Sequence, residues 1–178
     1  MTGMTKFGAG AIAALALLGA ETAQAQALGC VDPRDLSDAV VYTMPSLVDA
    51  FQTRCGTTMR GQGFLARDGA RFSARFESLA DRTWPGAYRV IKSFAAKDAD
   101  REMMTAFEQL PPDSMRLFVD TIVIQKVAQE IRVQDCAKID RGVELLSPLP
   151  VENVGGLASF IFEMAEVQNP SVCPFEAK

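Results

Sequence analysis

Apolar residues recur every three to four positions along most of the chain beyond residue 30, which is the spacing of one face of an α-helix. The pattern predicts an all-α fold, a small bundle-like domain of six to eight short helices. Helices are expected at residues 33–43, 45–55, 64–77, 83–96, 98–110, 112–132, 135–147 and 151–167.

Proline and capping residues mark where several of these helices should begin. Asp32 is followed by Pro33, which combines an N-cap side chain with a proline at the first helical position. Because a proline inside a helix removes a hydrogen bond, we expect one helix to stop near residue 43 and another to start around Pro45. Thr83 and Pro85 predict a further start in the same way.

The stretch 64–77 fits two kinds of element. Phe72, Phe76 and Leu79 follow helical spacing. Asp68 and Gly69 form a dipeptide that is also typical of a hairpin turn, and apolar and polar residues alternate after it. The Ala and Arg content of the stretch favours the helix.

The segment 112–132 is the longest predicted helix, and its apolar residues outnumber what one exposed face needs. We therefore expect it to lie at the centre of the core, with the other helices packed around it. Its apolar residues at helical spacing include Met115, Phe118, Val119, Ile122, Val123 and Val127.

The first 25 residues have the pattern of a cleaved signal peptide. Lys6 precedes a 13-residue apolar run at 8–20, and Ala-x-Ala cleavage sites follow. Residues 26–178 are then expected to form a single exported domain with no transmembrane segment. A lipoprotein signal ending at Cys30 is the alternative; it is less favoured because a polar stretch separates that cysteine from the apolar run.

Four cysteines lie beyond the signal segment, and an even number in an exported chain predicts two disulfides. They are Cys30, Cys55, Cys136 and Cys173. Pairing neighbours along the chain, Cys30 with Cys55 and Cys136 with Cys173, is favoured because each pair would bracket one helical hairpin. The chain has no His, so we expect no metal site and no cofactor.

Charge is unevenly distributed along the chain. The net charge is −4, which argues against nucleic acid as a partner. Residues 54–97, however, hold nine Lys or Arg and three acids. Arg67, Arg71, Arg75 and Arg82 share one helical face beside the phenylalanines, and arginine suits carboxylates and phosphates. They are the predicted ligand-binding residues, unless they pair with acids elsewhere on the protein and only solvate the surface.

These residues favour a binding protein over an enzyme. Without His the commonest general base and the usual catalytic triads are missing, and no glycine-rich loop for a nucleotide occurs. Arg outnumbers Lys by 12 to 6, which is typical of a GC-rich bacterial gene. We expect a periplasmic or secreted bacterial interaction module that contacts an anionic envelope component, such as a lipid headgroup, a glycan or an acidic protein.

Two alternatives stay open. Neighbouring carboxylates can cleave glycans without His, and the candidate pairs are Asp135/Asp140, Asp140/Glu144 and Glu163/Glu166. Such acids also form the ordinary polar face of an amphipathic helix. The second alternative is a structural envelope factor that holds no small ligand.

Overall fold

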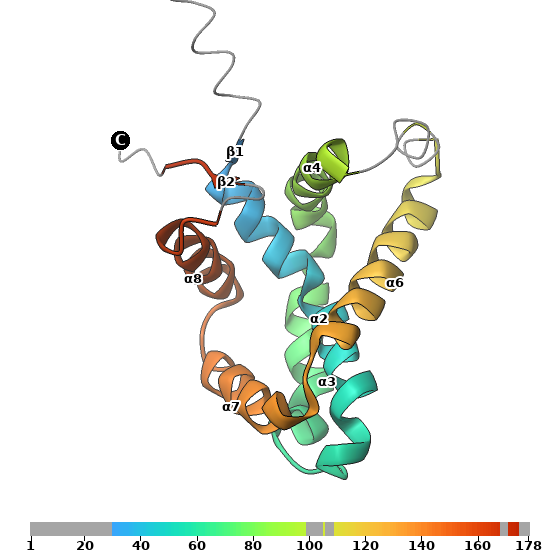
Figure 1. Cartoon of the computed structure of the whole chain (residues 1–178), viewed down its shortest axis with the longest axis vertical. Helices are drawn as coiled ribbons and strands as arrows, with labels where there is room; N and C mark the ends of the chain where they lie inside the picture. The colour runs from blue at the N-terminus through green and yellow to red at the C-terminus, as the bar shows by residue number, and fades with distance from the viewer. Residues whose placement is uncertain (1–29, 99–104, 106–108, 168–170, 175–178) are drawn as a thin grey trace, which may run out of the picture. The chain divides into compact units, whose positions relative to one another are not determined.

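The first helix, α2 (Pro33–Met59), begins where the sequence supplies both a cap and a proline. The Asp32 side chain accepts a hydrogen bond of 2.7 Å from the backbone N–H of Arg34, as the sequence predicts. The computed structural model of the protein describes residues 30–98, 105, 109–167 and 171–174 (Figure 1). In that part of the chain six α-helices account for most residues, which confirms the all-α fold.

The expected break near Pro45 does not occur, and α2 runs through that proline for 27 residues. A proline inside a helix costs about 3 kcal/mol because it removes one backbone hydrogen bond. Burial of the apolar face on both sides of Pro45 offsets this cost. Val41, Met44, Val48 and Phe51 all lie in the core. The helix ends at Arg60, whose left-handed backbone closes the last turn on Gly56.

Residues 64–77 form a helix, α3 (Phe64–Glu77), which settles the choice against a hairpin. Its buried positions, Leu65, Gly69, Phe72 and Phe76, repeat with helical spacing. The next helix, α4 (Ala80–Asp98), begins earlier than predicted. Thr83 does not cap it; this residue is buried within its first turn, where its hydroxyl donates to the carbonyl of Leu79.

Helix α6 (Pro112–Glu130) is not the central helix, which corrects the sequence prediction. It buries Met115, Val119 and Ala128, whereas Leu117 and Phe118 are exposed. Its apolar residues are spread around the whole helix. Their number therefore does not predict how much of the helix surface is buried against other helices. The predicted helix at 98–110 falls largely outside the described residues.

The C-terminal part follows the predicted hairpin. A short 3-10 turn, η1 (Val133–Asp135), leads into α7 (Cys136–Leu146), and α8 (Val151–Met164) follows it. Two short strands, β1 (Cys30–Val31) and β2 (Ser171–Val172), pair with each other. Among the described residues, no helix combines the length and the apolar composition needed to cross a membrane.

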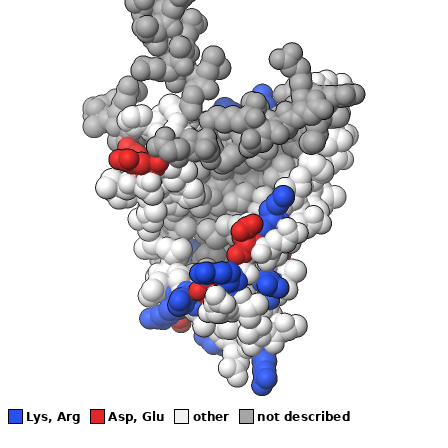
Figure 2. Space-filling model, in the orientation of Figure 1, with Lys and Arg blue, Asp and Glu red and all other residues white. Residues whose placement is uncertain are grey.

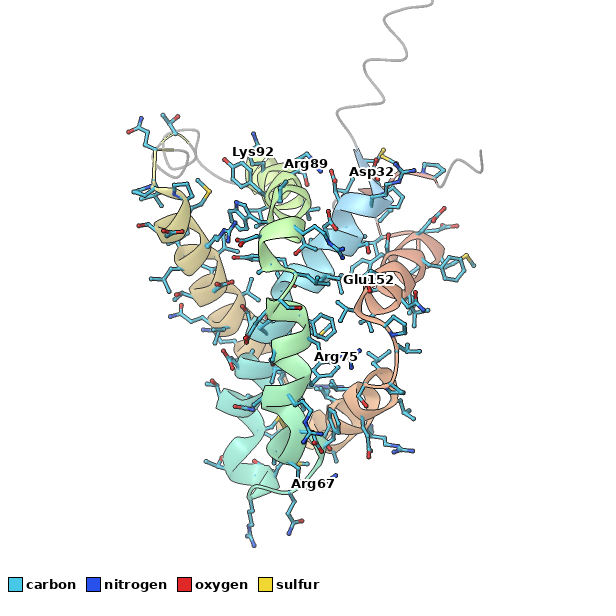
Figure 3. All side chains as sticks on the ribbon, turned by 180° about the vertical axis from the view of Figure 1, so that it is seen from behind. Asp32, Arg67, Arg75, Arg89, Lys92 and Glu152 are labelled. Atoms are coloured by element: carbon cyan, nitrogen blue, oxygen red, sulfur yellow. A yellow bond between two sulfur atoms is a disulfide. The ribbon has the colours of Figure 1, made fainter. Side chains whose placement is uncertain are left out.

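The centre of the fold is α2. It contacts α3, α4, α6, α7 and α8, and these helices all belong to one compact unit, Val31–Lys178. In Figures 1 and 3, α6 lies on one side of α2 and the α7–α8 pair on the other. The core follows the same axis, with one apolar cluster around Val48 and Phe51 and a second around Tyr42.

Small residues let α8 approach α2 closely. A Cβ placed on Gly155 would lie 2.5 Å from Ser37 Oγ and 2.8 Å from Val41 Cγ2, so only glycine fits there. One turn later the buried Ser159 donates a hydrogen bond of 2.8 Å to the carbonyl of Pro33. This spacing of two small residues is the usual device for a close helix crossing.

All four cysteines are disulfide-bonded, as predicted, but the favoured pairing is wrong. Cys55 on α2 bonds Cys136 at the start of α7, with a Cα–Cα distance of 5.8 Å, and Cys30 bonds Cys173. The prediction assumed that each bond brackets one hairpin. Because α2 continues unbroken to residue 59, it instead carries Cys55 into the core beside α7.

Candidate functional site

Two of the predicted arginines, Arg67 and Arg71, lie exposed on the outward face of α3. The side chain of Arg71 is 85% exposed, and its guanidinium lies 3.4 Å from the Asp68 carboxylate one turn earlier. A surface pair of this kind is weak and leaves the guanidinium available to another anion. Figure 2 shows Lys and Arg side chains in the lower half of one face, with acidic side chains between several of them.

Arg75 lies on the same row but has a different environment. It is partly buried, and its guanidinium donates to the backbone carbonyls of Ser147 and Leu149, in the segment that joins α7 to α8. Figure 3 shows this side chain among the helices, whereas Arg67 lies at the far end of α3. Arg75 therefore ties α3 to the C-terminal hairpin and leaves little capacity for a ligand.

Arg82 does not continue the row on α3, because the chain turns at residues 78–79 and α4 begins at Ala80. Its guanidinium lies 3.0 Å from the carboxylate of Glu152 at the start of α8, and both side chains are largely exposed. The pair bridges α4 and α8. A backbone hydrogen bond at Glu152 is the larger cause that lowers the pKa of its carboxyl, and the hydrogen bond from Arg82 is the second.

A cavity of about 180 Å³ lies beside the arginine row. Its lining combines two phenylalanines, of which Phe72 is buried, with two arginines and the Asp68 carboxylate. The Phe64 and Phe72 rings meet edge to face, with their centres 6.0 Å apart. The lining residues are Phe64, Asp68, Arg71, Phe72, Arg75 and Ser147.

The position of α3 is set by a carboxylate from another helix. Gly63 precedes α3 and has no side chain to cap it, so the first backbone N–H groups need an acceptor from elsewhere. Asp140 of α7 supplies it: its two oxygens accept from the N–H of Phe64 and of Leu65, each at 2.8 Å. The Asp140 side chain is buried, so this contact holds the cavity wall against α7.

One further exposed arginine, Arg60, was not among the predicted ligand-binding residues. Arg60 ends α2 and is exposed, only four residues before α3 begins. It lies outside the helical row, so spacing along one helix could not identify it. The excess of basic residues over 54–97 was the available signal.

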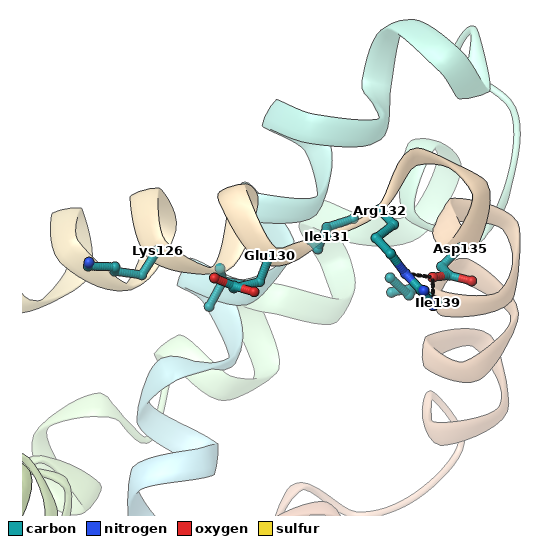
Figure 4. A pocket seen from close by; sticks show the side chains of 7 residues that line it. Lys126, Glu130, Ile131, Arg132, Asp135 and Ile139 are labelled. Carbon is teal, nitrogen blue, oxygen red and sulfur yellow. Dashed lines mark hydrogen bonds and ion pairs between the residues drawn. The ribbon is translucent and has the colours of Figure 1, made fainter.

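Three of the acidic residues considered for glycan cleavage, Asp135, Asp140 and Glu144, make contacts within the fold. Asp140 caps α3, and Glu144 pairs with Arg141 at 2.7 Å. Asp135 lines a second cavity, of about 450 Å³, together with Glu130 (Figure 4). A hydrogen bond from Arg132 lowers the pKa of the Asp135 carboxyl, which is opposite to what a general acid requires.

A partly buried polar cluster lies between α2 and α6. Asp120 of α6 accepts a hydrogen bond of 3.1 Å from Ser46 Oγ and another from Tyr42, both on α2. Burial raises the pKa of the Asp120 carboxyl and of the Tyr42 hydroxyl. Because its partners come from the central helix, this cluster fixes α6 against α2.

The geometry thus brings Arg71 and Arg75 to one cavity, leaves Arg67 exposed beside it and places Arg82 on the next helix. Comparison of the chain with protein-family models, with curated proteins and with solved structures finds no match. The function therefore has to be argued from the chemistry of these residues.

Proposed function

We propose that this protein is a non-catalytic binding module of the bacterial cell envelope that contacts an anionic group through Arg67 and Arg71. The observation that carries the proposal is the pair of exposed guanidinium groups near a cavity that is lined by Arg71 and the half-buried Phe64. Arginine binds carboxylates and phosphates through paired hydrogen bonds, and the half-buried Phe64 ring offers apolar contact to the rest of the ligand.

The four predicted arginines divide into two roles in this proposal. Arg67 and Arg71 contact the ligand, because their guanidinium groups are exposed. Arg75 and Arg82 position the site, because each already binds a group on the C-terminal hairpin. The anionic group belongs to a lipid headgroup, a glycan or an acidic protein, and all three would meet the same two side chains.

The compartment is part of the proposal. Two disulfides are typical of proteins exported from the cytoplasm, where thiols are kept reduced. We propose that residues 1–25 are a cleaved signal peptide and that 26–178 act as one domain in the periplasm or outside the cell. Disulfide bonds at both ends of the helical unit suit a module that has to stay folded in that environment.

The test replaces both exposed arginines, as Arg67→Glu with Arg71→Glu, and measures cosedimentation with vesicles that contain phosphatidylglycerol. Retention on an anionic polysaccharide column is measured in parallel, so that a lipid and a glycan are distinguished. Because the charge reversal acts on the ligand contact alone, binding should fall at least tenfold with an unchanged circular dichroism spectrum.

The matched control is Lys138→Glu with Arg141→Glu on α7, which makes the same change in net charge at two other exposed bases. Binding by the control variant should stay close to that of the wild type. Equal losses in both variants would mean that only net charge matters, and the arginine site would be rejected.

A further inference from the structure

Helix α8 exposes an unusual amount of apolar surface near its C-terminal end. Phe160 is 56% exposed and Met164 is 67% exposed, and they lie one turn apart on the same side. Leu157, Ile161 and Phe162 are exposed as well. Contiguous apolar surface on a folded protein marks an interaction site more often than it occurs by chance.

A groove of about 560 Å³ lies next to this surface, between the first turns of α2 and the last turns of α8. It continues the apolar surface, because Phe160 forms part of its wall, and Gly156 leaves room there. The lining residues are Pro33, Arg34, Ser37, Asp38, Gly156, Ser159, Phe160 and Glu163.

Asp38 lines the groove where α2 meets α4, with its carboxylate packed against Gly86, and among the described residues no ion pair joins it to a cation. Burial raises the pKa of its carboxyl, and the neighbouring Asp35 adds to the rise, so its negative charge is poorly compensated. The two arginines that act on it from a distance are engaged elsewhere: Arg89 binds Asp35 at 2.6 Å, and Arg82 binds Glu152. A cation entering the groove would relieve this cost.

The charges around the groove indicate whether the partner that binds there should be positively or negatively charged. Arg34 is the basic residue of the lining, and it stands against Asp38 and Glu163. Asp32 and Asp35 lie in the adjoining turn of α2, and Arg89 pairs with Asp35. An anionic membrane would be repelled by this acidic rim, and so would the identical face of a second copy.

We propose that the α2–α8 groove docks a basic amphipathic helix of a partner protein. The apolar side of that helix packs against Phe160, Ile161 and Met164, and one of its Lys or Arg side chains reaches Asp38. This is the helix-in-groove mode of recognition, in which spaced apolar anchors supply affinity and charges supply specificity. The groove shares no residue with the arginine site, so each proposal stands or fails independently.

The test uses two labelled peptides, each about 18 residues long to exceed the length of α8. One is an amphipathic helix of Leu and Lys, and the other replaces every Lys with Glu. Fluorescence anisotropy is recorded while the full mature protein is titrated. The Lys peptide should bind, and the Glu peptide should bind at least tenfold more weakly.

Variants then locate the site. Phe160→Ala and Asp38→Asn should each weaken binding of the Lys peptide about tenfold, because both remove a central contact. Met164→Ala is a second test that does not touch the core, since its side chain is largely exposed. Leu145→Ala on α7 is the control, because Leu145 is 60% exposed and lies outside the groove.

Three results would overturn the proposal. Equal binding of the two peptides would remove the charge selection, and equal effects of the Phe160 and Leu145 variants would remove the location. A concentration-dependent dimer in light scattering, abolished by Phe160→Ala, would assign the groove to a second copy of the chain instead.

Discussion

Replacing Asp140 should lower the free energy of unfolding by more than a substitution on the surface of α7 usually does. Asp140→Ala leaves the N–H groups of Phe64 and Leu65 without their acceptor at the start of α3. Loss of an N-cap costs about 1 kcal/mol, and a buried donor without an acceptor costs about 1–3 kcal/mol. Because these contributions overlap, we expect a loss of about 3 kcal/mol in the free energy of unfolding.

Two further variants make this magnitude specific. Asp140→Asn keeps one acceptor oxygen and should cost about half as much. Glu144→Gln lies one turn further along α7 and breaks an exposed pair with Arg141, so it should cost about 0.5 kcal/mol or less. Asp140→Ala also carries a local signature, because the amides of Phe64 and Leu65 should exchange hydrogen faster than in the wild type.

The assay is urea unfolding followed by circular dichroism, with free energies from linear extrapolation. The slope with urea should be the same for all three variants, since the fold and its exposed area on unfolding do not change. If Asp140→Ala cost no more than Glu144→Gln, the cap would not stabilise α3, and the account of how α3 is positioned would be wrong.

Two other predictions concern the core. Cys55→Ala with Cys136→Ala opens a loop with a sequence separation of 81, and chain entropy predicts a loss of about 4.5 kcal/mol in unfolding free energy, measured with urea; a loss below about 1 kcal/mol would contradict it. The pKa of the Asp120 carboxyl is raised in the folded protein above its ordinary value of 3.8. The protonated carboxyl therefore stabilises the fold below pH 3.8, and this stabilisation is lost as the pH rises through the pKa of the folded state. Asp120→Asn should therefore gain stability relative to the wild type between pH 3.8 and neutrality, and parallel pH profiles would refute this.

The spacing of apolar residues predicted well which segments are helices, because apolar residues at helical spacing form the face that is buried. Phe72 and Phe76 were assigned to a helix from spacing alone, and both are buried in α3. Boundaries were less predictable, because proline acts locally whereas the packing that outweighs it is tertiary. Pro45 lies inside a helix that buries apolar residues on either side, and Pro85 lies inside α4 between the buried Thr83 and the buried Ala87.

The centre of the fold could not be read from apolar content. Helix α6 has many apolar residues, but Leu117 and Phe118 are exposed, and α2 is the helix that contacts the other five described helices. For the candidate site, spacing placed Arg67, Arg71 and Arg75 on one face. It could not show that Arg75 binds backbone carbonyls more than 70 residues away, because a carbonyl has no signature in the sequence.

The nested order of the two disulfides has a consequence for secretion. An exported chain emerges from its N-terminus, so Cys30 and Cys55 reach the oxidising side before either of their native partners, Cys173 and Cys136. A bond formed at that moment joins the wrong pair and has to be exchanged before α7 can close on α2. If the chain is exported as proposed and Cys30 bonds Cys55 first, its maturation requires disulfide isomerisation as well as oxidation, which a chain with neighbouring pairs would not require.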